Sequence, residues 1–316
     1  MSVLSRPEFH EEAAAIAYVE AKLWPQGPVC PHCGERERIG KLQGKSTRLG
    51  VHKCYNCRKP FTVKVGTIFE SSHVKMNLWL QAIYLMCASK KGISANQLHR
   101  TLGVTLKTAW FMGHRIREAM RTGDLTPFGG EGQPVEADET YIGKKENAPT
   151  MRTDGTPFRR SKHGRGPSGK RAVVALVERG GRVRSFHIER ADKKTVGAIV
   201  ASNIARESRL MTDESALYSL VGPSFASHQT VKHSAEEYVR GDVHTNTIES
   251  VFSVLKRGMK GTYQHCREKH LHRYLAEFDY RYNNRVALGV DDETRFDTAL
   301  AGVAGKRLKY ADPAKT

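Results

Sequence analysis

Two cysteine pairs constrain the fold of this chain more than any other feature of its sequence. Cys30 and Cys33 belong to the string CPHC, Cys54 and Cys57 belong to CYNC, and twenty residues separate the pairs. Each Cys-x-x-Cys turn presents two thiolates to one side of a tetrahedral Zn²⁺ ion, and two such turns complete its ligand set. The polar stretch 36–53 between them predicts a short β-hairpin that zinc must hold together, because its own core is too small. The sequence therefore predicts a zinc ribbon.

Two disulfide bonds, or four unrelated thiols, are the alternatives for these cysteines. The N-terminal string MSVLSRPEFHEEAAA is polar and carries no signal peptide, so we expect a reducing cytoplasm, which favours metal-bound thiols. No apolar run approaches the roughly 18 residues of a membrane span, so we expect no membrane partner. The remaining cysteines, Cys87 and Cys266, have no cysteine neighbour and are expected to be packed thiols.

The charge of the chain predicts a polyanionic partner. Fifty-one Lys and Arg stand against 33 Asp and Glu, which gives a formal net charge of +18 and a pI near 9.7. Such a field attracts nucleic acid and makes binding strongly dependent on salt. A membrane surface or a ribosome would also suit a basic chain, so charge alone favours nucleic acid without selecting it.

Two α-helices joined by a short glycine turn are predicted between Ser94 and Met120. Ser94 stands where an N-cap is needed, Gly103 begins the turn, and apolar residues recur at steps of three and four in the second helix. This is the helix-turn-helix pattern, for which a plain helical hairpin is the alternative. The basic outer face that would recognise DNA is expected from Lys107, His114 and Arg115.

The rest of the chain alternates strands with helices. Strands are predicted as a pair over 61–69 and singly over 135–142, 172–178, 183–189 and 209–213; helices are predicted over 78–89 and 193–204, after 213, and from about 247 and 268. This order indicates an α/β fold in which helices flank a mixed sheet. Residues 144–171 hold nine Lys and Arg but two acids, among Gly, Pro and Ser. We expect a basic insertion there that is mobile or is ordered by DNA.

Three acids stand beside the ends of predicted elements. Asp138 lies in a strand, Asp213 ends a later strand, and Glu249 begins a long helix, with 74 and 35 residues between them. Carboxylates gathered from separate elements repel one another unless cations neutralise them, so the cluster predicts a Mg²⁺ or Mn²⁺ site. Two such ions about 3.5–4 Å apart activate a nucleophile and stabilise the leaving oxygen of a phosphodiester. Glu139 should point to the opposite face of the strand, and Glu136 shares the face of Asp138 nearer the strand start.

The helix that follows His244 carries a second pattern. Asn246, Glu249 and Lys256 share one polar stripe, and Lys256 stands seven residues after Glu249. A metal carboxylate followed two turns later by a lysine would place a phosphate-pairing cation beside the metal. The alternative is a capping box, in which Asn246 is the N-cap and Glu249 follows three residues later. The residues leave both interpretations open.

The chain resembles bacterial insertion-sequence transposases of the zinc-ribbon, ISXO-like type. The matching strings are CPHCG (30–34), YNCRKPFTVKVGTIFE (55–70), EADETYIGKK (136–145), TDE (212–214), HTNTIESVFSVLKRGMKGTY (244–263) and HLHRYLAEFDYRYNNR (270–285), which span nearly the full length. The resemblance implies a catalytic domain similar to RNase H and retroviral integrases. It also implies the domain ranges 1–70 for the N-terminal segment and zinc ribbon, 71–127 for the helix-turn-helix region, 128–300 for the catalytic domain and 301–316 for a C-terminal tail.

The resemblance further implies a DDE site whose first two acids are Asp138 and Asp213. Members of the family carry Asn or Glu at the third position, and this chain offers both Asn246 and Glu249. The interval of 35 residues and the step to Lys256 favour Glu249 as the metal ligand, while Asn246 would cap the helix or hold a water or phosphate.

The activity that the resemblance implies is DNA transposition, in which the protein cuts the ends of its own element and joins them to target DNA. The implied cofactors are structural Zn²⁺ and catalytic Mg²⁺ or Mn²⁺. The implied partners are double-stranded terminal inverted repeats, target DNA and further copies of the chain, in a cytoplasmic, nucleoid-associated location. Two other functions remain open: a catalytically silent or co-opted DNA-binding regulator, and a metal-dependent nuclease or resolvase without strand transfer.

Overall fold

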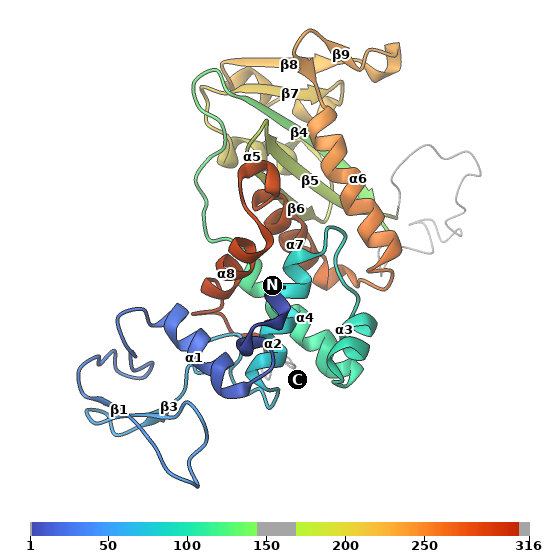
Figure 1. Cartoon of the computed structure of the whole chain (residues 1–316). Coiled ribbons are helices and arrows are strands. Elements are labelled where there is room, and N and C mark those ends of the chain that lie inside the picture. The colour runs from blue at the N-terminus through green and yellow to red at the C-terminus, as the bar shows by residue number, and fades with distance from the viewer. Residues whose placement is uncertain (1, 144–168, 310–316) are drawn as a thin grey trace, which may run out of the picture. The chain divides into compact units, whose positions relative to one another are not determined.

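Residues 2–143 and 169–309 are described by the computed structural model, and the chain divides into two units (Figure 1). The first unit joins Met1–Thr122 to Asn284–Thr316, and the second is Gly123–Asn283. The domain ranges from the sequence divide the chain differently and stay a prediction. The basic insertion predicted at 144–171 falls almost wholly outside the described residues. None of the helices in the described part is both long and apolar enough to cross a membrane.

A five-stranded mixed sheet forms the centre of the second unit, in the order β6–β5–β4–β7–β8. Its strands are β4 (Pro134–Ile142), β5 (Arg171–Glu178), β6 (Val183–Ile188), β7 (Arg209–Asp213) and β8 (Ser227–Val231). The first three pair antiparallel as a meander, whereas β7 runs parallel to β4 and β8 runs parallel to β7. This order and these directions are those of the RNase H-like fold, so the expected α/β class is confirmed.

Helices cover both faces of this sheet, which explains why β5 is apolar along its length. Val173 faces one layer, formed with α6 (Asn246–Gly261) and α7 (Leu271–Asn283). Val174 faces the opposite layer, formed with α5 (Lys193–Asn203). Figure 1 shows α6, of the first layer, crossing β4 and β5. Because successive side chains point to opposite faces, a strand that is buried on both must be hydrophobic at every position.

Helix α7 also covers the free edge of β6. The side-chain amide of Asn283 accepts from the Val183 N–H at 2.7 Å and donates to the Val183 carbonyl at 2.9 Å. The carboxylate of Asp279 accepts from the backbone N–H and the hydroxyl of Ser185, both at 2.7 Å. An uncovered edge strand would be free to pair with another chain, and these side chains occupy its hydrogen-bonding groups.

The carboxyl group of Asp279 should make the stability of the protein depend on pH. Burial raises the pKa of its carboxyl to about 6, against the opposing effect of the Ser185 donors, whereas an unfolded Asp titrates near ~3.9. Between these values the folded protein binds more protons than the unfolded chain, so stability falls as pH rises from about 4 to above 6, by roughly 1–3 kcal/mol. Asp279→Asn keeps one acceptor for the N–H and offers a donor to the hydroxyl, so the fall should be absent. Urea unfolding of both proteins at several pH values measures the free energy of unfolding. An equal dependence of that free energy on pH in the two proteins would contradict the prediction.

The first unit has a helical core that includes the end of the chain. Helices α1 (Glu12–Leu23), α2 (Met76–Ala88) and α8 (Asp292–Ala301) surround the ring of Phe296, which lies 5.6 Å from that of Phe9 and 5.9 Å from that of Tyr84. Helix α2 confirms the helix predicted over 78–89, whereas α8 was not predicted. Its packing shows that the residues after 283 belong with the N-terminal unit.

The predicted helix-turn-helix geometry is present between Ser94 and Met120. Ser94 caps α3 (Ala95–Leu102) by accepting from the Gln97 N–H at 3.1 Å. Gly103 ends that helix at φ +66°, a left-handed conformation that glycine adopts without strain. Thr105 then caps α4 (Leu106–Met120) in the same way.

The predicted basic outer face is wrong for two of its three residues. His114 and Arg115 are only 1% and 7% exposed, because α4 is enclosed on more than one side. The Arg115 guanidinium donates to the carbonyls of Ile68 at 2.8 Å and Glu70 at 2.9 Å, so it stabilises the loop after the ribbon. Lys107 is exposed near the start of α4, as expected.

Two further local predictions were wrong, and one strand was not predicted. The strand pair over 61–69 reduces to β3 (Pro60–Phe61), since the following residues form turns. The helix expected after Asp213 is replaced by the 3-10 turns Ala216–Tyr218 and Gly222–Ser224. Strand β8 was not predicted, because its string SHQTV is polar and partly exposed at the sheet edge and so lacks the apolar alternation of a strand.

Candidate functional site

The four cysteines of the ribbon lie together, as the spacing predicted. Strands β1 (Ile39–Lys41) and β2 (His52–Cys54) form the expected hairpin between the two pairs, and β3 extends it to a three-stranded antiparallel sheet. Each Cys-x-x-Cys turn ends in a residue with positive φ, Gly34 at +77° and Arg58 at +62°. The two turns therefore have the same form, although only one of them has the glycine that this conformation favours.

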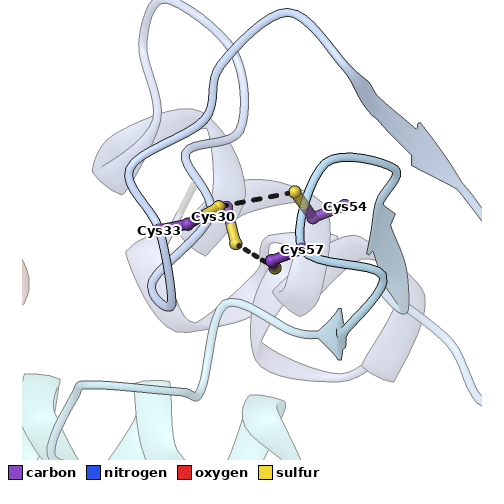
Figure 2. A group of neighbouring side chains, drawn as sticks. All are labelled: Cys30, Cys33, Cys54 and Cys57. Carbon is purple, nitrogen blue, oxygen red and sulfur yellow. Dashed lines mark hydrogen bonds between the residues drawn. The ribbon is translucent and has the colours of Figure 1, made fainter.

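The sulfur atoms have the separations that a tetrahedral zinc ion requires (Figure 2). Cys30 Sγ lies 3.7 Å from Cys57 Sγ, and Cys33 Sγ lies 3.6 Å from Cys54 Sγ. Zn–S bonds of about 2.3 Å at tetrahedral angles place sulfurs about 3.8 Å apart. Among residues 2–143 and 169–309, these cysteines are the one group of three or more possible ligands whose atoms all lie within 4.8 Å of one another.

The electrostatics of the thiols also suit a metal. Burial acts to raise the pKa of Cys30, but the backbone N–H groups of His32 and Cys33 and the neighbouring sulfurs outweigh it, so the pKa falls to about 7. For Cys33 the N–H of Glu35 lowers the pKa, yet burial and three neighbouring sulfurs raise it to about 12. Four thiols this close cannot all ionise unless a cation neutralises them, and Zn²⁺ would do so.

The ribbon gains additional support from α1 because its own core is small. Glu20 of α1 accepts from His52 Nε2 at 3.1 Å and from Lys41 Nζ at 3.2 Å. The Trp24 ring, just after α1, makes edge contacts with the His52 ring at 5.4 Å and the Phe61 ring at 5.8 Å. These few contacts explain why the fold of the ribbon should depend on its metal.

The sheet of the second unit brings two of the predicted acids to neighbouring strands. Glu136 of β4 pairs with Met211 of β7 in parallel register, and two further residues along each strand place Asp138 beside Asp213. Burial raises the pKa of Asp138 most, the charges of Asp213, Glu139 and Glu249 add to the rise in that order, and together these effects bring it to about 8. Asp138, Asp213 and Glu249 therefore lie in one electrostatic neighbourhood, in which a bound cation would favour the ionised form of Asp138.

The three carboxylates do not converge on a single point. They do not form a group within 4.8 Å in the described part of the chain, where the cysteines alone meet that limit. A pair of ions about 3.5–4 Å apart, each about 2.1 Å from its ligands, spreads those ligands over roughly 8 Å. The described residues therefore do not show a ready-made site for one ion shared by all three acids, and their assignment as metal ligands stays a prediction.

A cavity of about 540 Å³ lies over Asp138 and Glu249. Its lining joins carboxylates of β4 and α6 to cations of α6, and consists of Asp138, Glu139, Thr140, Glu249, Phe252, Ser253, Lys256, Arg257 and Lys260. Asp213 and Asn246 are not among the lining residues. Phosphodiester chemistry needs two kinds of group: carboxylates that bind metal ions, and lysine or arginine side chains that pair with phosphates.

The other two carboxylates of β4 are engaged elsewhere. Glu136 is 0% exposed and bonded to the start of α6, as described below. Glu139 accepts from the hydroxyl of Tyr218 at 2.9 Å, and its pKa is raised by burial. These contacts favour Asp138 as the acid of β4 that faces a metal. No local pattern in the sequence predicts these partners, because they depend on which distant segments pack together.

The start of α6 differs from the capping box that the sequence left open. The N-cap is Thr245, not Asn246, and Glu249 therefore stands one position too late to complete the box. Instead Glu249 Oε1 accepts from the Thr245 hydroxyl at 3.2 Å and lies 3.7 Å from His233 Nε2. Asn246 is the exposed first residue of the helix, and Lys256 is exposed two turns after Glu249.

Comparisons with known proteins match two separate parts of the chain. Residues 130–283 match the family described as ISXO2-like transposase domain, and residues 10–60 match the transposase zinc-ribbon domain. A protein of Halobacterium salinarum named "Uncharacterized protein in transposable element ISH50" is 28% identical over 282 residues, which cover 86% of this chain and 91% of that protein. The Mos1 strand transfer complex and the Mos1 paired-end complex with left transposon end each cover 66% of this chain and 77% of theirs, at 10% identity and TM-scores of 0.23 and 0.22. Scores this low carry no argument.

Proposed function

This chain belongs to the insertion-sequence transposases that combine a zinc ribbon with an ISXO2-like transposase domain, and from that premise we propose that it cleaves the ends of its own element and joins them to target DNA. The observation that carries the proposal is the register that brings Asp138 of β4 towards Asp213 of the parallel strand β7, together with a cavity that Asp138, Glu249 and Lys256 line. Acids from three separate elements share that neighbourhood, as metal-dependent phosphoryl transfer requires.

Asp138, Asp213 and Glu249 would hold the metal. Two Mg²⁺ or Mn²⁺ ions bound there would lower the pKa of the attacking water or 3′-hydroxyl and neutralise charge on the leaving oxygen. Lys256 would pair with a phosphate beside the scissile bond, and the apolar ring of Phe252, 6.0 Å from its Nζ, would support the lysine stem. Water attacks in cleavage, and the freed 3′-hydroxyl attacks in strand transfer.

The first unit would recognise the inverted-repeat ends. Lys107 is exposed at the N-terminal turn of α4, the part of a recognition helix that reaches base edges. On the ribbon Tyr55 is 50% exposed with Lys53 Nζ 5.8 Å from its ring, which offers DNA a cation beside a stacking surface. Because two ends must be held together during transposition, the active form would be a homo-oligomer on DNA, acting in the cytoplasm at the nucleoid.

The test uses a duplex that carries the terminal inverted repeat found beside the coding region, a target plasmid and Mg²⁺. Wild-type protein should nick the duplex at the repeat end and join it to the plasmid. Asp213→Ala should do neither but should still shift the duplex in a binding gel. Cut ends that are never joined would indicate a nuclease or resolvase. Specific binding without any metal-dependent nicking by wild type would indicate a regulator.

A further inference from the structure

Strand β4 carries two carboxylates besides Asp138. One contacts the helix that holds another predicted acid, and the other contacts the turn that follows the remaining one. Glu136 bonds to the start of α6, which carries Glu249. Glu139, on the opposite face, bonds to the turn after Asp213. Both carboxylates belong to the same short segment, Glu136 to Glu139, in which Asp138 is the residue proposed to face the metal.

Glu136, which lies on strand β4, caps the N-terminus of helix α6. Its Oε2 accepts from the Ile248 backbone N–H at 2.9 Å, and its Oε1 accepts from the Thr247 hydroxyl at 2.9 Å. The first N–H groups of a helix have no partner within the helix, and the N-terminus favours negative charge. A fully buried carboxylate at this point therefore fixes the first turn of α6 against β4, and Glu249 is the next residue after Ile248.

Arg179 stabilises this buried charge and holds the segment that leads into α6. Its Nε lies 2.7 Å from Glu136 Oε1, within the hydrogen-bond range of a charge-assisted pair. Its remaining nitrogens donate to the carbonyls of Asp242 at 2.5 Å and His244 at 2.9 Å. One guanidinium thus binds both the carboxylate and the backbone just before the helix.

Glu139 makes the corresponding connection to the second acid. Its Oε2 accepts from the hydroxyl of the fully buried Tyr218 at 2.9 Å, and its Oε1 accepts from the Ser215 hydroxyl at 3.4 Å. The Ser215 N–H in turn donates to Asp213 Oδ1 at 3.0 Å. Ser215 therefore links Glu139 to Asp213, and the anchored Tyr218 ring keeps the turn in place.

We infer that Glu136 and Glu139 are positioning residues, which set Glu249 and Asp213 at their distances from Asp138 without binding metal themselves. The inference rests on the proposed function of this site. Partners of metal ligands typically change metal affinity or activity by about 10–100-fold when they are removed. Loss of either contact should therefore raise the metal requirement and leave DNA-end binding unchanged.

The experiment measures nicking by full-length protein over a series of Mg²⁺ concentrations. Glu139→Gln, Ser215→Ala and Thr247→Val should each raise the Mg²⁺ concentration for half-maximal nicking by about 10–100-fold, with a maximal rate within a few-fold of wild type. Asp279→Asn, which changes an engaged carboxylate elsewhere in the same unit, should keep the wild-type requirement. Calorimetric titration with Mn²⁺ gives the metal affinity without relying on activity.

The outcomes separate positioning from structure. An unchanged metal requirement in folded Glu139→Gln and Thr247→Val would overturn the inference. A variant that loses its nicking rate, does not regain it at excess metal and unfolds at a lower midpoint would also overturn it. Thr247→Val tests the contact with α6 without changing the fully buried Glu136 carboxylate. If wild type never nicks DNA, the proposed function fails, and the Mn²⁺ affinities of the same variants still decide the inference.

Discussion

Glu249→Gln should abolish strand transfer, with a fall of at least ~10³-fold in rate, because an amide cannot supply the negative charge that two divalent ions need. Binding to the element ends should stay at the wild-type level, since α6 keeps its Thr245 N-cap and its Glu136 contact. Quantified joining of a pre-cut end to a target plasmid measures the rate. Glu207→Gln, which removes an exposed negative charge from the same unit, is the matched control.

Asn246→Ala should change the joining rate by no more than a few-fold. Glu249 lines the cavity with Asp138 and Lys256, whereas Asn246 does not line it. The charge of Glu249 also acts on the Asp138 carboxyl and raises its pKa. If Asn246→Ala eliminated joining while Glu249→Gln did not, then the third ligand would be Asn246, and the side chain of Glu249 would serve only its contact with Thr245.

Strands and helices with a strong local pattern could be predicted from the sequence. Strand β7 was predicted to the residue, because the string RLMTD places the apolar residues Leu210 and Met211 just before Thr212 and Asp213. Strand β8 and helix α8 were not predicted: the first is polar, and the second is identified mainly by the side chains that it buries against a distant part of the chain. Local periodicity therefore located the elements whose own residues carry the pattern.

The candidate site could be predicted in its residue types but not in its support. Asp213 ends its strand and Glu249 lies in the first turn of its helix, although Asp138 lies in the middle of β4, and the cysteine spacing is itself the geometry of a metal site. The capping of α6 shows what was hidden: the local string offered Asn246 with Glu249, but Glu136, more than a hundred residues earlier, provides the contact. A long-range partner of this kind depends on strand register, which a single sequence does not encode locally.

Cys54→Ser should release the zinc and unfold the ribbon, while the unit Gly123–Asn283 stays folded. In zinc-finger peptides the metal supplies about 10–16 kcal/mol of folding free energy, and a fully buried thiolate cannot be replaced by a weaker, neutral hydroxyl ligand. Zinc content should fall from one ion per chain to none, and amide exchange should become fast across residues 30–61. Cys87→Ala removes another buried thiol of the same unit and should retain the metal.

The same variant should also lose its preference for the element ends, because the exposed Tyr55 and the neighbouring Lys53 are held in place only by the folded ribbon. Phosphate contacts from the rest of this basic chain would persist, so non-specific binding should remain and should weaken with salt. Competition between end duplex and random duplex at a fixed salt concentration distinguishes the two effects. A Cys54→Ser protein that still carried one zinc and still selected its ends would show that the four thiols do not act as one ligand set, and the ribbon would have to be stabilised by its contacts with Glu20 and Trp24 instead.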